Sequence, residues 1–364
     1  MLNASIDLVP LPDMLGQPIA PWISQFLMAL TLALHWVFIA ITLCGSIFYF
    51  SSRKDHSDEM INVQQRLASF LPFSLSMAMT LGIAPLLFVQ VLYGNFFYSS
   101  TIMFGWVWLG LLPLTAANLY LLFLGRYQNK KGKSCHLIAI IVLLFMAVSA
   151  VILSSNSTLL QNPQDWESFR SLAANKPYLA DATLWPRLML AAFALFAGGN
   201  LFIALYLRFK LDMSDNGARK KITSKLKLTV IGIIGVLLAC IWVSQSLNAN
   251  VKSIILNSWE SVFVYVSIVS LILALLLSIL SLGGKMIFLL LGSVSFFMAL
   301  LCLAFTRDTL RRAALSDYFN LYEISVKAQW SSLVLFLIVF VLGLLLVAYM
   351  VNLAITSRQK PLET

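Results

Sequence analysis

Long apolar stretches, separated by short polar ones, recur along the whole chain. A membrane-spanning helix needs about 20 predominantly apolar residues to cross the hydrocarbon core. Stretches of that kind cover approximately residues 22–50, 67–93, 100–125, 136–154, 185–207, 227–246, 261–282, 285–305 and 330–355. The longest polar stretch, roughly Ser154 to Trp185, has only the length of a loop. The pattern predicts an all-α, polytopic integral membrane protein with about nine transmembrane helices in a single membrane domain, residues 1–364.

The composition supports the same class of protein. Hydrophobic residues make up 60% of the chain, charged residues only 11%, and the mean hydropathy is +0.88. So few polar side chains cannot coat a soluble globule, and most of the surface must therefore face lipid. The chain lacks a Gly-x-x-x-x-Gly-Lys-Ser phosphate loop, so it is not expected to use ATP by itself. No basic cluster is interleaved with exposed aromatic residues, and we expect no nucleic-acid partner.

The basic residues indicate the orientation of the chain. Of the 25 Lys and Arg residues, 17 lie in the loops at 51–66, 126–135, 208–227 and 283–285 or in the C-terminal tail. The loops on the opposite side hold the other eight. Cytoplasmic loops carry the excess of positive charge. The N-terminus is therefore predicted to lie outside the cytoplasm and the C-terminus inside, and the net charge of +10 should attract anionic lipid headgroups.

The cysteine and acidic residues exclude several kinds of site. Cys44, Cys135, Cys240 and Cys302 show no CxxC or CxxCH spacing, so they predict neither a zinc site, nor covalent haem, nor a disulfide framework. All 15 acidic residues lie outside the predicted spans or at their edges. Since ion-coupled transporters usually need an intramembrane carboxylate, this distribution argues against a proton-coupled transporter.

One polar side chain at membrane depth stands out. His35 lies near the middle of the first apolar stretch, roughly 20 Å from the outer end of the predicted helix at 1.5 Å per residue. A buried histidine of this kind often only hydrogen-bonds a neighbouring helix. A neutral imidazole is also a good axial ligand for haem iron, so both interpretations stay open.

Three short segments resemble subunit I of the cytochrome bd family of quinol oxidases. The first runs from Gln25-Phe through His35-Trp to Thr42-Leu-Cys-Gly45, the second is Gly82 to Asn95, and the third is Asp308-Thr-Leu-Arg311. That subunit also has nine helices, with the N-terminus outside and the C-terminus inside. The resemblance implies a bd-like fold and a location in the cytoplasmic (inner) membrane of a prokaryote.

The resemblance also implies functional residues. The family's histidine in the first helix ligates a haem, which implies that His35 is an axial ligand of a haem b iron. Asp308 and Arg311 occupy the place of an outer acidic residue followed three positions later by Arg, and are expected to belong to the cofactor site. Arg311 is expected to pair with Asp308 or with a haem propionate.

A quinol contact is expected at the end of the second segment. Gln90, Tyr93 and Asn95 lie where the family has a Phe-Gln-Phe-Gly-Thr-Asn segment near the outer surface.

The chain also departs from the family. The family's second haem-ligating His opens the fifth span, where this chain reads Trp185-Pro-Arg187. Met189 is the one candidate ligand nearby, and packing in the core is the alternative interpretation of its side chain. The region between the sixth and seventh spans, Asn248 to Glu260, is about a dozen residues long, so the family's long quinol-binding loop is missing. We therefore expect at most one haem b, and no oxygen reduction by this chain alone.

Two functional hypotheses remain. The first is a membrane subunit of a respiratory electron-transfer assembly that passes electrons between the quinone pool and a partner on the periplasmic side. The second is a non-redox scaffold, anchor subunit or carrier with an inherited bd-like fold. In both, the partners are the lipid bilayer and other subunits, either on the periplasmic side or within the membrane. The stretch from Arg307 to Glu323 is expected to be an amphipathic segment at the membrane surface where such a partner docks.

Overall fold

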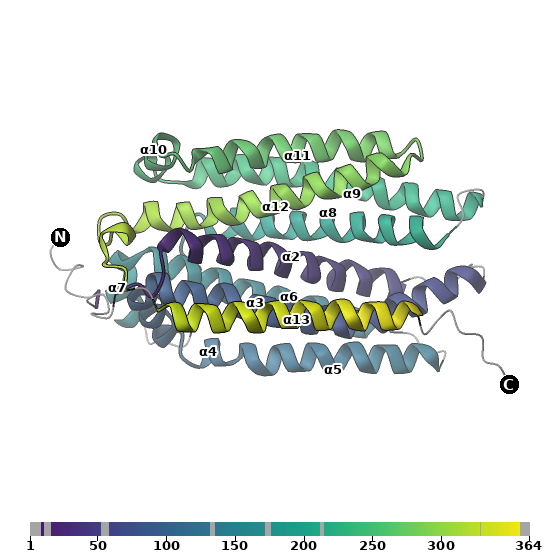
Figure 1. Cartoon of the computed structure of the whole chain (residues 1–364), viewed down its shortest axis with the longest axis horizontal. Coiled ribbons are helices and arrows are strands. Elements are labelled where there is room, and N and C mark those ends of the chain that lie inside the picture. Colours follow the sequence, from purple (N-terminus) through teal and green to yellow (C-terminus); the bar gives the residue numbers. More distant parts are fainter. Residues whose placement is uncertain are drawn as a thin grey trace.

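The structure, a computed structural model, describes residues 9–10, 16–51, 58–131, 135–171, 176–211, 215–327 and 329–356. These residues form a bundle of long helices that lie side by side (Figure 1). The long helices are α2 (Pro21–Ser51), α3 (Asp58–Phe104), α5 (Leu111–Lys130), α6 (His136–Gln161), α8 (Leu184–Lys210), α9 (Asn216–Ser246), α11 (Ser261–Ser281), α12 (Met286–Leu315) and α13 (Trp330–Thr356). Short helices lie between them: α4 (Trp106–Leu109), η1 (Pro163–Asp165), α7 (Trp166–Ser171), α10 (Ala249–Asn257) and η2 (Leu321–Glu323).

The helices have the length and composition of membrane spans. Within the described residues, eight segments are long and apolar enough to cross a bilayer, and each coincides with one of the first eight predicted stretches. The ninth predicted stretch lies in α13, whose part Trp330–Leu346 is a further apolar helix. α2 begins at one end of the bundle and α13 ends at the other (Figure 1). The prediction of an all-α, polytopic membrane protein is confirmed.

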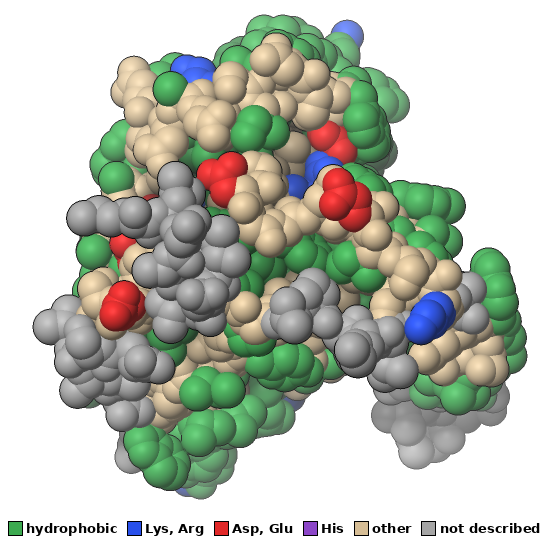
Figure 2. Space-filling view, turned by 90° about the vertical axis from the view of Figure 1, so that its left-hand side faces the viewer, with side chains coloured by type: hydrophobic (Ala, Val, Ile, Leu, Met, Phe, Trp, Pro, Cys, Tyr) green, Lys and Arg blue, Asp and Glu red, His purple; other side chains and the backbone are tan. Residues whose placement is uncertain are grey.

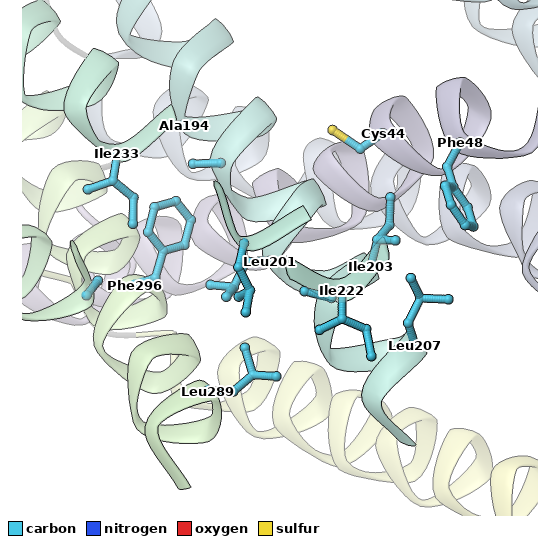
Figure 3. Packing of buried hydrophobic residues seen from close by; sticks show 14 of the residues in the cluster. Cys44, Phe48, Ala194, Leu201, Ile203, Leu207, Ile222, Ile233, Leu289 and Phe296 are labelled. Carbon is cyan, nitrogen blue, oxygen red and sulfur yellow. The ribbon is translucent and has the colours of Figure 1, made fainter. Parts of the chain in front are cut away.

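Helix α2 is the centre of the bundle, because it packs against α3 on one side and against α8 and α12 on another. Small residues permit the contact with α8. A Cβ atom added at Gly199 would overlap the Ala40 carbonyl oxygen and the Cys44 side chain, so this position requires a glycine. Close approach through small residues is the usual way in which membrane helices associate. Figure 3 shows the apolar cluster that surrounds this contact, with Cys44 and Phe48 beside residues of α8, α9 and α12.

Two helix boundaries differ from the predicted spans. α3 is interrupted at Tyr93, where the predicted span ends, but helical structure resumes after it and reaches Phe104. The next turn is at Gly105, whose φ of 51° and ψ of −121° favour glycine. α12 continues ten residues beyond the predicted end at 305, to Leu315. The prediction that the segment from Arg307 onward is an amphipathic stretch on the membrane surface is wrong for its first part. Asp308 and Arg311 are buried there, with 3% and 4% of their surface exposed.

The segments that precede α2 and α13 are hydrogen-bonded to each other. The Gln17 N–H donates to the Ser325 carbonyl oxygen at 2.9 Å, and the Lys327 N–H donates to the Gln17 carbonyl oxygen at 2.9 Å. Together they form a parallel bridge between Gln17 and Val326. α2 and α13 therefore begin at the same end of the bundle.

We predict the orientation from the charge asymmetry between the two ends of the bundle. A reporter fused after Thr364 should report a cytoplasmic position, because the basic loops lie at that end. A reporter inserted beside Pro163 should report an external position. Paired alkaline phosphatase and fluorescent protein fusions measure both, and the same side for both insertions would show that one predicted span does not cross the membrane.

Candidate functional site

Polar side chains from three helices meet at the end of the bundle where α2 begins and α12 ends. The Asp308 carboxylate accepts hydrogen bonds at Oδ1 from the Tyr93 hydroxyl (3.0 Å) and from Arg311 Nη1 (2.9 Å). Its Oδ2 accepts from Gln25 Nε2 at 2.9 Å. All four residues are at least nine-tenths buried. We refer to Gln25, Tyr93, Asp308 and Arg311 as the Asp308 cluster.

Local backbone structure positions three members of this cluster. Asp308 and Arg311 are three residues apart on α12, a spacing that places their side chains on one helix face. Tyr93 interrupts α3 with a φ of −135° and a ψ of 36°, next to Gly94, a residue with low helix propensity. The expected pairing of Asp308 with Arg311 is confirmed as an ion pair with an Nη1–Oδ1 distance of 2.9 Å. The role of either residue toward a cofactor stays a prediction.

A second layer of polar contacts surrounds the cluster toward the end of the bundle. Arg312 forms an ion pair with Glu260, with an Nη2–Oε1 distance of 2.6 Å. The Tyr322 hydroxyl donates to Gln25 Oε1 at 3.2 Å. Partial burial raises the pKa of Tyr322, so this hydroxyl keeps its proton at neutral pH. Figure 2 faces this end and shows acidic and basic side chains that are scattered rather than gathered in one patch.

Two more arginines lie next to the cluster. Arg187 Nη1 donates to Gln161 Oε1 at 2.9 Å. Within the described part of the chain, Arg307 has no hydrogen bond or ion pair, although the charges of Arg187 and Arg311 and the opposite charge of Asp308 act on it. Arg307 is also near enough for its charge to act on His35. A cation without a partner inside a membrane protein is costly, so this region suits an anionic group.

His35 lies on the α3 side of α2. Its Nδ1 is 2.6 Å from the Ala78 carbonyl oxygen. A Cβ added at Gly82 would come within 2.7 Å of the same nitrogen. A carbonyl oxygen can only accept, so Nδ1 carries the proton and the neutral ring keeps its lone pair on Nε2. Thr31, one turn before His35 on α2, donates its hydroxyl to the carbonyl oxygens of Leu27 and Met28.

The structure does not bring Met189 together with His35. Met189 is 40% exposed on α8, which packs on the side of α2 that carries Ala40 and Cys44. His35 faces α3 instead. Of His35 and Met189, only His35 is therefore placed to ligate the iron of a haem at this position. The Nε2 lone pair of His35, left free by the hydrogen bond at Nδ1, and the nearby cation of Arg307 fit such a group.

The three predicted quinol contacts have different environments. Tyr93 is completely buried, and its hydroxyl is bonded to Asp308. Asn95 Nδ2 donates to the Pro10 carbonyl oxygen at 3.0 Å. Gln90 is partly buried on α3. Only Tyr93 therefore belongs to the Asp308 cluster, and quinol contact by these residues stays a prediction.

Sequence reasoning missed the roles of three residues in this region. Gln25 was part of the bd-like segment but was not recognised as a partner of Asp308, and Glu260 and Tyr322 were not singled out as contacts. An amide in the first turns of an apolar helix is a signal that could have identified Gln25, because such a group needs a polar partner.

Comparison with known proteins supports the architecture. No protein-family model matches the chain, and no curated protein matches it. A chain in the structure of bd oxidase from Geobacillus thermodenitrificans has a similar fold, with a TM-score of 0.70 and 13% sequence identity. The match covers 94% of this chain and 99% of that chain. At this identity the likeness shows the fold, and it confirms the bd-like fold expected from the three segments.

We predict that Arg311→Leu destabilises the protein more than Arg312→Leu. Removal of Arg311 leaves the Asp308 carboxylate buried without its charged partner, which costs about 3–5 kcal/mol. Arg312 is more exposed, so its loss should cost less. The midpoint of thermal unfolding in detergent measures the loss of stability in both variants. The amounts of haem and of partner subunits that are retained on purification are measured on the same samples.

The double variant Asp308→Asn/Arg311→Leu serves as a control. It removes the unpaired charge and should recover part of the stability lost in Arg311→Leu. Equal losses of stability in Arg311→Leu and Arg312→Leu would show that Arg311 acts only as one of several charged residues at this end of the bundle.

Proposed function

We propose that this chain is a membrane subunit of a respiratory electron-transfer assembly that binds one haem b at His35 and contacts quinol from the outer side. It passes electrons between the quinone pool and a partner subunit on the periplasmic side. The membrane is the cytoplasmic membrane of a prokaryote. The similarity in fold to a bd oxidase chain over nearly the whole length supports this assignment.

The proposal rests on one observation, the hydrogen bond that orients the His35 ring. A histidine that only joined two helices would be satisfied by the hydrogen bond from Nδ1 to Ala78. The same bond also fixes the tautomer and the ring orientation that a metal-ligating histidine needs. When bound, a haem supplies one-electron transfer. His35 would hold its iron, and Arg307 and Arg311 would face its propionates.

The quinol contact is proposed where α3 approaches the outer end of the bundle. Gln90 and Asn95 flank Tyr93 on this part of the helix. Through Tyr93 the contact is linked to Asp308. An amide can bind a quinol hydroxyl or a quinone carbonyl, so Gln90 and Asn95 can hold either redox form.

A scaffold or anchor subunit without a redox group is the second candidate. One observation favours it: both oxygens of Asp308 are bonded to side chains of this chain. The cluster therefore needs no cofactor to satisfy its charge. In this case the chain holds other subunits in place through its bd-like fold.

A visible spectrum of the protein, purified from its own membrane with its partners, separates the two candidates. A Soret band that shifts on reduction with dithionite supports the redox subunit. The band must be recorded in a fraction where this chain is the only one able to hold the haem. A colourless preparation supports the scaffold. Identification of the co-purified chains by mass spectrometry tests the assembly itself.

We predict that His35→Ala abolishes the haem signal while the protein still inserts into the membrane. Loss of the Ala78 hydrogen bond should cost only about 1 kcal/mol of stability, as for interhelical hydrogen bonds in other membrane proteins. His136→Ala is the matched control, because His136 is exposed at the opposite end of the bundle, and should leave the spectrum unchanged. A haem that survives His35→Ala with an unchanged spectrum would show that another residue is the ligand.

A further inference from the structure

A small pocket lies at the end of the bundle opposite to the Asp308 cluster. It is formed by the end of α8, the start of α9 and the turn between α11 and α12. Its polar lining comes from Arg208, Thr223, Ser281 and Lys285, and none of the described Asp or Glu residues lines it. The remaining lining residues are apolar, apart from Gly284: Ile222, Leu226, Leu282, Met286 and Leu289. The pocket encloses only about 10 Å³, room for about one water molecule, so the two positive charges and the apolar residues meet at its mouth.

The two cations in this pocket have no counter-charge within the described residues. Arg208 Nε is completely buried and has no hydrogen-bond partner there. Lys285 Nζ lies 5.8 Å above the centre of the Phe288 ring, and no ion pair with a described carboxylate is present. Because a buried guanidinium N–H without a partner costs free energy, Arg208 needs an acceptor that the described part of the chain does not supply.

Backbone groups add to the positive potential. α12 begins at Met286 on the wall of the pocket, and its N-cap, Lys285, forms no side-chain cap. The first N–H groups of a helix lack partners within the helix and attract anions. They act together with Arg208 and Lys285 on the same small volume.

We propose that this pocket binds the phosphate of a phospholipid headgroup. α8 has 27 residues, about 40 Å at 1.5 Å per residue, so its end reaches the headgroup region beyond a hydrocarbon core of about 30 Å. Arg208 and Lys285 bind the phosphate oxygens, and Thr223 donates its hydroxyl. The apolar wall accepts the start of an acyl chain, a contact that a free phosphate ion cannot make. Basic pockets between membrane helices bind anionic lipids in this way.

Native mass spectrometry of the purified chain with its partners, titrated with dioleoyl-phosphatidylglycerol in detergent, tests the proposal. Arg208→Gln/Lys285→Gln should weaken the tightest lipid-binding event by about tenfold or more, because it removes two charge-assisted contacts. Lys210→Gln/Lys227→Gln removes the same charge from exposed positions at the same end and should leave it within about twofold. Equal losses in the two double variants would overturn the proposal.

Two further measurements keep the result interpretable. If Arg208→Gln/Lys285→Gln does not elute as a folded species, Lys285→Gln alone replaces it, because Lys285 is exposed, and unchanged binding there would also overturn the proposal. Inorganic phosphate in excess over the lipid is the competitor. Retention of the lipid supports a headgroup site, whereas displacement by inorganic phosphate would show a site for free phosphate instead.

Discussion

The Asp308 carboxylate holds one end of this bundle together. Its three hydrogen-bond donors come from α2, α3 and α12, which are otherwise joined mainly by apolar contacts. In a bilayer, apolar contacts between helices compete with equally apolar contacts to lipid, so they do not by themselves fix which helices meet at a given depth. A buried carboxylate does, because every arrangement that separates α12 from Gln25 on α2 or from Tyr93 on α3 takes hydrogen-bond donors away from the buried charge of Asp308. The position of α12 relative to α2 and α3, and thus the environment of His35, depends on this interaction.

Much of the fold could be predicted from sequence because lipid imposes a length on every span. Stretches of about 20 apolar residues coincide with the helices, and the basic ends of α5 and α8 lie with the start of α9 at one end of the bundle. Boundaries were less predictable. Helical structure resumes after the interruption of α3 at Tyr93 and reaches Phe104. Residues 94–104 are mostly apolar, so hydrophobicity does not mark the end of the helix. The end of α12 was missed because Asp308 and Arg311 read as surface residues when their partners are unknown.

Part of the candidate site could be predicted, and the rest depends on tertiary contacts. The pairing of Asp308 with Arg311 follows from a local spacing of three residues, so sequence was enough to expect it. The contacts of Gln25 and Tyr93 with Asp308 span 283 and 215 residues, and no local pattern encodes them. The partner of His35 is a backbone carbonyl on α3. Every residue type has such a group, so the sequence does not single it out.

These long separations also determine the order in which the molecule can be completed during synthesis. Ribosomes add roughly 5–20 residues per second, so Gln25 and Tyr93 are in the membrane roughly 10 to 60 s before Asp308 leaves the ribosome. Until then their amide and hydroxyl groups have no carboxylate to bind, and Gln17 has no strand partner at Val326. A nascent chain that has inserted α2 and α3 is therefore an open intermediate at this end. It closes only after α12 and the segment that follows it have been synthesised.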